Sequence, residues 1–147
     1  MPLVDGNGYI LATTDIVAGN HNDAYQLTET LKKLFGDLKR TGVSYKDAFF
    51  NADSSFDTRA ARKLLWNAGV IPNIAENKRG RKTTKRGRKR HFNRDVYKRR
   101  FAIERTFAWI DKFRTLLIRF ERKGSYFLGF HYLAFALINL RNLLPLV

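Results

Sequence analysis

Short apolar runs alternate with turn-forming residues at the start of the chain. Residues 2–4 and 9–13 are mostly apolar, and the sequence Asp5-Gly6-Asn7-Gly8 lies between them. Gly, Asn and Asp tolerate the positive φ angles of tight hairpin turns. The pattern therefore predicts a strand, a turn and a second strand.

Apolar residues then recur at helical spacing. Leu27, Leu31 and Leu34 fall on one face, with polar and charged residues between them. Asp23 is a suitable cap at the start of this helix, and Gly42 ends it.

A short buried strand is predicted at residues 48–52, and it delivers Asp53 at its carboxyl end. Turn and capping residues follow, and a helix through Trp66 comes next. Asp57 is better placed than Asp53 to cap that helix. Residues 70–74 predict one more short strand, in which Pro72 is expected at the edge.

The carboxyl-terminal part is predicted to be helical. Asn93 or Asp95 is a suitable cap for one long helix that runs towards Gly124. A second apolar helix follows and includes residues 126–140. This run is too short and too often interrupted by polar residues for a membrane span, so it predicts a buried helix.

These elements predict the α/β class. Strands that alternate with helices, followed by helices alone, indicate a single domain over residues 1–147 with a mixed sheet and flanking helices.

The charge of the chain points to a polyanionic partner. Lys and Arg number 28 against 13 Asp and Glu, a net charge of +15. Ten of these cations lie in residues 78–94, which contain no acidic residue. The segment predicts a mobile basic loop that contacts nucleic-acid phosphates, and a merely solvated charge run or a tail of the ribosomal-protein kind is the alternative. The absence of cysteine excludes disulfides and thiol catalysis.

Two carboxylates are candidates for metal chemistry. Asp53 lies at a strand end, where open α/β sheets bind ligands, although it could simply cap the next helix. Glu104 lies at the border of the apolar face of a helix, where it could face a cleft or pair with Arg100. Carboxylates from distant parts of a chain can converge on Mg²⁺.

Other polar and aromatic residues are predicted to be structural. His21 and Asp23 fit turn and cap roles better than a metal site, and Asp5 fits a turn. The remaining candidates, His131, Trp66 and Trp109, are predicted core residues, with an interface as the alternative for the histidine.

Four segments in order resemble the DDE transposases of bacterial insertion sequences. They are residues 3–8, 19–23, 51–57 and 97–121. The family signature reads Tyr, two residues, Arg, three residues, Glu, six residues, Lys. Here Tyr97, Arg100 and Glu104 match it, whereas the lysine position holds Asp111, with Lys112 about 100° further around the helix.

The resemblance implies a ribonuclease H-like fold whose acidic residues bind Mg²⁺ or Mn²⁺ for DNA cleavage and strand transfer. Asp53 would be the second acid and Glu104 the third, and a metal-bound water or a DNA 3′-hydroxyl would attack phosphorus. The residues expected to contact DNA are Lys78, Arg79, Arg81, Lys82, Lys85, Arg86, Arg88, Lys89, Arg90, Tyr97, Arg100 and Lys112.

The family's first catalytic Asp lies on a strand that would precede residues 2–4. The resemblance therefore implies the carboxyl-terminal part of a catalytic domain, with the first strand missing. A catalytically inactive DNA-binding remnant that modulates a full-length transposase is the alternative function, and a membrane-surface protein is a weaker one. The expected partners are transposon-end and target DNA, and either a second copy of this chain or a full-length transposase. No membrane or nucleotide cofactor is expected, and the expected location is cytoplasmic and nucleoid-associated.

Overall fold

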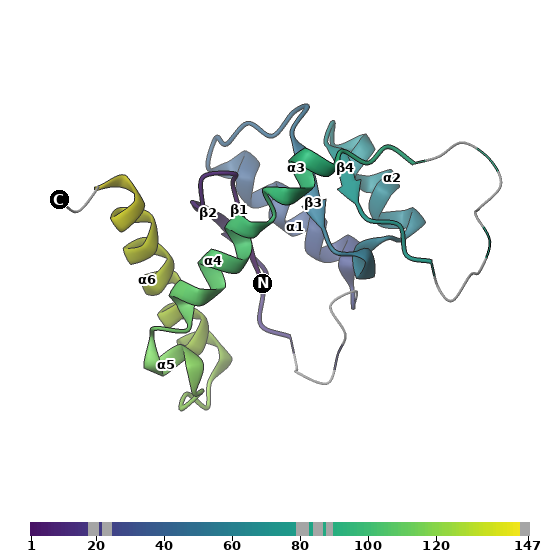
Figure 1. Ribbon diagram of the computed structural model, residues 1–147. Coiled ribbons are helices and arrows are strands. Elements are labelled where there is room, and N and C mark those ends of the chain that lie inside the picture. The colour runs from purple at the N-terminus through teal and green to yellow at the C-terminus, as the bar shows by residue number, and fades with distance from the viewer. Residues whose placement is uncertain (18–20, 22–24, 79–82, 84–86, 88–89, 145–147) are drawn as a thin grey trace. The chain divides into compact units, whose positions relative to one another are not determined.

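The chain forms two compact units in the computed structural model, which describes residues 1–17, 21, 25–78, 83, 87 and 90–144 (Figure 1). The hairpin unit combines Met1–Ala18 with Phe101–Val147, and the parallel unit is Gly19–Arg100. Each unit holds two strands and several helices, so the predicted α/β class is confirmed. The single domain over residues 1–147 stays a prediction.

The hairpin unit begins with the predicted antiparallel strand pair. Strand β1 is Pro2–Val4 and strand β2 is Ile10–Thr13. In the turn between them, the Asp5 carboxylate accepts the backbone N–H of Tyr9 at 2.8 Å, and Gly8 has a φ of 99°. Asp5 thus has the predicted turn role, and the positive φ explains the glycine.

Three helices complete this unit: α4 (Phe101–Ile110), α5 (Arg114–Leu117) and α6 (Gly124–Leu143). They bury one apolar cluster with β2, consisting of Ile10, Ile110, Leu116, Ala134, Phe135 and Ile138. The side chain of Asn139 also bonds to β2, because it accepts the N–H of Ile10 at 2.8 Å and donates to the carbonyl of the same residue at 2.9 Å. A helix side chain here satisfies the backbone groups that a neighbouring strand would otherwise satisfy.

The single long helix predicted from Asn93 or Asp95 towards Gly124 is wrong. The structure has three separate helices there: α3 (Arg94–Lys98), α4 and α5. At the first break, the N–H groups of Arg99 and Arg100 bond to carbonyls three residues back rather than four, and Lys112 does the same at the second. Such tightened bonds are typical of helix ends.

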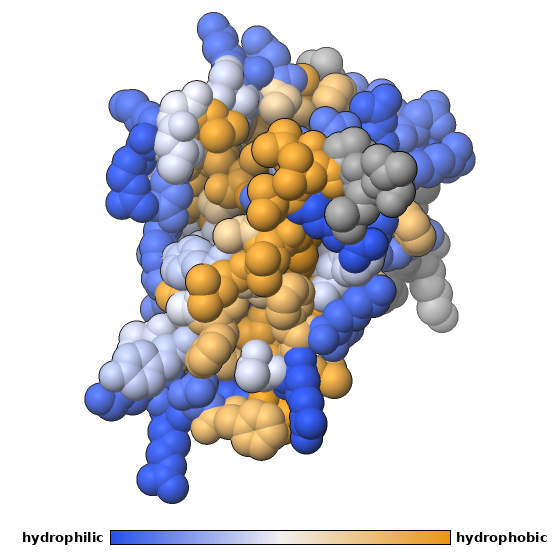
Figure 2. Space-filling view, turned by 90° about the vertical axis from the view of Figure 1, so that its left-hand side faces the viewer, coloured by the Kyte–Doolittle hydropathy of each residue, from blue (hydrophilic) through white to orange (hydrophobic). Residues whose placement is uncertain are grey.

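Helix α6 is much less buried than its apolar sequence predicted. Only Ala134, Phe135 and Ile138 are buried, whereas Leu133 is 63% exposed. Seen from the α6 side, hydrophobic side chains form a broad exposed area (Figure 2). The apolar residues of α6 surround the helix instead of forming one stripe, and a helix that packs on one side covers only that side. In the described part of the chain, no helix is long and apolar enough to cross a membrane.

The parallel unit is built around two parallel strands, β3 (Phe49–Ala52) and β4 (Ile71–Ile74). The short helix η1 (Ser54–Phe56) and helix α2 (Arg59–Asn67) connect them. Each unit therefore has its own two-stranded sheet, and the described strands of neither unit form the larger mixed sheet that was predicted.

Helix α1 (Leu27–Arg40) buries the predicted face, including Leu27, Leu31 and Leu34. Asp23, its predicted cap, lies outside the described residues. The helix packs against α2, which also packs against β4.

Two predictions for α2 are wrong. Thr58 caps the helix, because its hydroxyl accepts the N–H of Ala61, whereas Asp57 has other partners. Trp66 is 54% exposed and does not belong to the core. The buried positions are Ala61 and Leu65, four residues apart, and the next residue lies about 100° further around the helix.

Candidate functional site

Asp53 lies directly after β3, at the edge of the sheet where the carboxyl ends of both parallel strands meet. Its side chain is a local cap, since it accepts the N–H of Ser54 at the start of η1. The alternative in which Asp53 caps the helix through Trp66 is wrong, because Thr58 caps α2. The residue is nevertheless exposed, so the carboxylate is accessible to a ligand.

Three asparagines form a hydrogen-bonded group beside this strand end, which we call the asparagine clasp: Asn51, Asn73 and Asn93. Asn73 is fully buried and donates to Oδ1 of Asn51 at 2.7 Å and to the carbonyl of Asn93 at 2.9 Å. Its own Oδ1 accepts the N–H of Asn93 at 2.7 Å. Asn51 donates to the carbonyl of Val96 at 3.1 Å. The clasp thereby joins β3, β4 and α3.

The same clasp fixes where α3 begins. The Asn93 side chain accepts the N–H groups of Asp95 and Val96 at 3.0 and 3.1 Å, which confirms its predicted capping role. Tyr97 lies on this helix, and the guanidinium carbon of Arg100 lies 5.5 Å from the centre of the Tyr97 ring. One signature residue, Tyr97, is therefore held on a helix that is tied to the strand preceding Asp53, and Arg100 lies close to its ring just after that helix.

Asp57 is buried, and it contacts the residue before the basic segment (residues 78–94) and a residue near the end of that segment. Its carboxylate accepts the Arg62 Nε at 2.7 Å, the N–H of Asn77 at 2.9 Å, and a guanidinium N–H of Arg90. Burial by itself raises the pKa of a carboxyl group, but the Asn77 hydrogen bond and the two guanidinium groups outweigh it. The pKa of Asp57 is therefore below its ordinary value of 3.8.

The basic segment is described only in part. Of the residues expected to contact DNA, the described part includes Lys78 and Arg90, and Arg90 forms an ion pair with Asp57. Seven residues expected to contact DNA lie outside the described residues: Arg79, Arg81, Lys82, Lys85, Arg86, Arg88 and Lys89. The predicted mobility of this segment also lies outside the description.

Glu104 lies in the first turn of α4 and is exposed. The buried positions of this helix are Ala102, Thr106 and Ile110, so Glu104 belongs to the solvent-facing side of α4. It lies in the hairpin unit and Asp53 in the parallel unit. Its pairing with Arg100 stays a prediction.

Lys112 lies just after α4, over the ring of Trp109, with 3.9 Å between its Nζ and the ring centre. Trp109 is partly buried against the apolar cluster of the hairpin unit, as predicted for a core aromatic. The guanidinium carbon of Arg141 on α6 lies 3.7 Å from the same ring centre.

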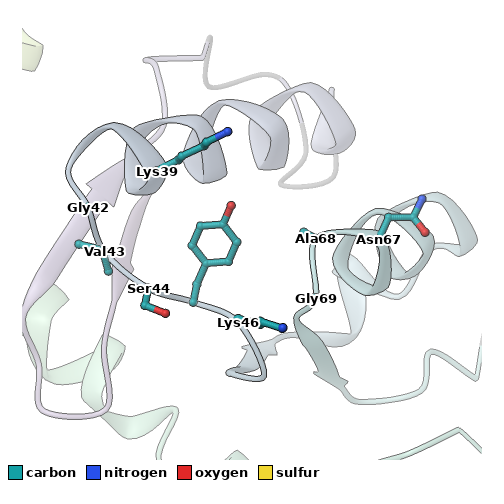
Figure 3. A pocket seen from close by; sticks show the side chains of 9 residues that line it. Lys39, Gly42, Val43, Ser44, Lys46, Asn67, Ala68 and Gly69 are labelled. Carbon is teal, nitrogen blue, oxygen red and sulfur yellow. The ribbon is translucent and has the colours of Figure 1, made fainter.

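A pocket of about 520 Å³ lies at the other end of the parallel strands (Figure 3). Its lining comes from residues 42–46, which precede β3, from residues 67–69, which precede β4, and from Lys39 on α1. Asp53 follows β3, so this pocket is not at the predicted catalytic edge.

The other candidates have structural contacts. His21 stacks on Tyr25 with 3.7 Å between ring centres, and its suggested partner Asp23 lies outside the described residues. His131 is half-buried, and its Nδ1 lies 2.9 Å from the carbonyl of Phe127. Among the residues that the structure describes, no three His, Asp or Glu side chains gather as a metal site.

The asparagine clasp and the ion pairs of Asp57 were not predicted. A signal for the clasp is present in the sequence, because Asn51 and Asn73 are the polar residues at the third position of two short, otherwise apolar strands. The sequence carries no comparable signal for the partners of Asp57.

Comparison with known proteins places these residues in a family. The family model described as "Transposase DDE domain" matches residues 50–141, which include Asp53 and Glu104. A protein of Burkholderia cepacia, named as a transposase for insertion sequence element IS402, is 32% identical over 130 residues. The match covers 84% of this chain and 53% of the relative, so the chain spans about half the length of that protein. No solved structure matches the chain.

Proposed function

This chain belongs to the DDE transposases of insertion sequences, and from this premise we propose that it forms part of the domain that cleaves DNA and transfers the cut strand. The match of the family model over residues 50–141 carries the proposal. We further propose a ribonuclease H-like fold. The parallel pair β3 and β4, with α2 in the connection, supports it.

Asp53 and Glu104 are the proposed catalytic acids. Both are exposed carboxylates, and the hard oxygen ligands they offer fit Mg²⁺ or Mn²⁺. When bound, such a cation activates a water or a DNA 3′-hydroxyl and stabilises charge on the phosphodiester. Asp53 follows a strand that the asparagine clasp ties to its neighbours, and its carboxylate also accepts the N–H of Ser54.

DNA phosphates are the proposed ligands of the basic segment and of α3. The many Lys and Arg residues of 78–94 supply the positive charge. Asp57 contacts both Asn77, just before this segment, and Arg90, near its end. Tyr97 lies on the clasped helix just beyond the segment, and Arg100 lies in the turn that follows this helix.

The test is nicking of a DNA substrate that carries the element's ends, with Mg²⁺ or Mn²⁺. The chain, in a version extended upstream to include the missing strand and its acid, is compared with its Asp53→Asn and Glu104→Gln variants and with Asp95→Asn, an exposed acid on α3, as the matched control. We expect each of the first two substitutions to abolish nicking and to weaken Mn²⁺ binding measured by calorimetry, with Asp95→Asn unchanged. Nicking that survives both substitutions would refute the assignment of the acids.

The same assay separates the alternative function. A chain that binds the DNA ends but does not nick them with either cation, even in the version extended upstream, would be the DNA-binding remnant. The assay is therefore repeated after addition of a full-length relative. A remnant is expected to lower the relative's activity in proportion to its own concentration, whereas Mn²⁺ binding at Asp53 and Glu104 would contradict this alternative.

A further inference from the structure

Five exposed apolar residues of α6 recur with the spacing of a coiled-coil seam. Tyr126, Phe130, Leu133, Leu137 and Leu140 follow one another at steps of four, three, four and three residues. Their side chains are 37–63% exposed. At about 100° per residue, all five lie within about 40° of one line along the helix. We call these five residues the α6 seam.

The seam is separate from the face by which α6 packs in its own unit. The buried residues Ala134, Phe135 and Ile138 are centred about 130° further around the helix. Helix α6 therefore carries a second apolar face, within the broad exposed hydrophobic area seen from the α6 side (Figure 2). Contiguous apolar patches of more than a few hundred Å² are rare on monomers and mark interaction sites.

The spacing of the seam indicates the shape of its partner. Alternate steps of three and four residues average 3.5, the repeat at which two helices keep the same faces towards each other as they coil. Side chains in such a row fit into the gaps between equivalent side chains of the facing helix. The seam therefore fits another helix that carries the same repeat.

Charge and symmetry favour the α6 of a second copy as that helix. Arg141 is the only charged residue between Gly124 and Leu143, and its guanidinium lies over the Trp109 ring of its own unit. Two chains that each carry a net charge of +15 repel each other, and an almost uncharged helix is where this repulsion is smallest. In a two-fold symmetric pair, each seam meets an identical one, so large apolar side chains face each other along its length.

The area available on α6 suits a small dimer interface. The helix has 20 residues and is therefore about 30 Å long. Tyr132 and Leu143, which are 53% and 66% exposed, lie beside the seam and extend its apolar area. Interfaces of ordinary size bury about 800 Å² on each partner, and weaker complexes bury less. We therefore expect a dimer that dissociates in the micromolar range.

We propose that two copies of this chain pair through their α6 seams, in a two-fold symmetric contact of helix on helix. This inference does not rest on the proposed function, because it uses only the exposure, spacing and charge of α6. Loss of DNA cleavage would leave it intact.

The first test is sedimentation velocity of the chain over a concentration series from about 1 to 100 µM. We expect monomers at the lowest concentration and dimers at the highest. Leu133→Ala/Leu137→Ala removes four seam side chains from each dimer and should weaken pairing on the order of a hundredfold or more. The matched control, Tyr132→Ala/Leu143→Ala, removes exposed apolar side chains beside the seam and should weaken pairing by less than about tenfold.

A cysteine crosslink tests the alignment of the two helices. The chain contains no cysteine, and Leu133 lies at the middle of the seam. In a symmetric pair, Leu133→Cys is therefore close to its own copy whether the helices run parallel or antiparallel. We expect a disulfide-linked dimer on mild oxidation. Ala136→Cys, which is exposed on the same helix but outside the seam, should crosslink much less.

Each of several outcomes would overturn the proposal. They are a chain that stays monomeric at the highest concentration, equal weakening by the control, and equal crosslinking of the two cysteine variants. Assemblies of no fixed size would do so as well, because the apolar face would then associate without specificity. Thermal melts of dilute protein check that each variant is folded. A large loss of stability there for Leu133→Ala/Leu137→Ala would mean that the same chain covers its own seam, which also contradicts pairing.

Discussion

The parallel unit and the hairpin unit differ in the polar groups that they bury and in the apolar side chains that they expose. The parallel unit buries polar groups, such as Asn73 and Asp57, and gives them several hydrogen bonds. The hairpin unit leaves large apolar side chains in solvent, among them Leu133 and Leu137 of α6. The contrast is one of degree, because the hairpin unit also buries Thr13 and Thr106 and the parallel unit also exposes Trp66.

The difference shows where single substitutions act. Among the described residues, every buried side-chain nitrogen or oxygen has a hydrogen-bond partner. Removing one partner in the parallel unit therefore leaves a buried polar group without a hydrogen bond, which destabilises the fold. On α6, most apolar side chains touch solvent already, so only the few buried positions contribute strongly to stability.

The largest effect is expected for Asp57→Ala. The substitution leaves the partly buried guanidinium groups of Arg62 and Arg90 without their carboxylate, and loss of one partner of a buried ion pair costs about 3–5 kcal/mol. Urea denaturation measures the change in the free energy of unfolding. Asp95→Ala removes a surface pair with Lys98 and should cost less than about 1 kcal/mol. Equal losses in both variants would show that the Asp57 pair is no more important than a surface pair.

Ile138→Ala is expected to have the next largest effect on the free energy of unfolding. Ile138 is 5% exposed in the core of the hairpin unit, and truncation of a buried isoleucine costs about 2–4 kcal/mol through lost burial and the cavity left behind. Leu133→Ala, on the same helix but exposed, should cost less than about 0.5 kcal/mol in protein too dilute to pair. A large loss for Leu133→Ala in thermal denaturation would show that something covers this face.

Asn73→Ala breaks the asparagine clasp. The substitution removes the partners of the Asn51 amide oxygen and of the Asn93 backbone, with an expected cost of about 2–3 kcal/mol. Asn67→Ala, at the exposed end of α2, is the control. Proteolysis after residue 90 should also become faster in Asn73→Ala, because the start of α3 loses its attachment. Unchanged proteolysis would contradict the clasp's part in holding α3.

The smallest effect is a pH dependence. The pKa of Asp57 is lowered in the folded protein, so the stability that this group contributes is fully present above its ordinary pKa of 3.8. This contribution falls as the pH drops from 3.8 through the folded-state pKa, because the unfolded chain binds the proton more readily. Urea denaturation over this range should show a shallower acid decline for Asp57→Asn. An identical decline in both proteins would contradict the lowered pKa.

The sequence predicted most elements because their signals are local. The hairpin around Asp5, the buried face of α1 and the strand that ends at Asp53 all follow from residue spacing and turn chemistry. The uninterrupted helix after Asn93 was wrong, because nothing in its apolar spacing marks the breaks at residues 99–100 and 112–113. The first break lies where the chain passes from the parallel unit to the hairpin unit, and the second lies inside the hairpin unit.

The residue types of the candidate site and its family were predictable from the sequence, but the hydrogen bonds and ion pairs around it were not. Asp53 and Glu104 were found from their position and from the spacing with Tyr97 and Arg100, and their function as catalytic acids stays a prediction. Asp57 was assigned to a cap from neighbouring sequence, whereas its partners Asn77 and Arg90 lie 20 and 33 residues away. Pairings over such distances do not follow from local propensity.

The sequence by itself determined the family, the α/β class and the strong positive charge, since motif spacing and composition are properties of the chain alone. Only the tertiary structure decided which polar residues are buried as partners, which face of α6 is covered, and that Lys112 and Arg141 share Trp109. The physical reason is that hydrogen bonds, burial and charge repulsion depend on distances in space, and residues far apart in the sequence set those distances.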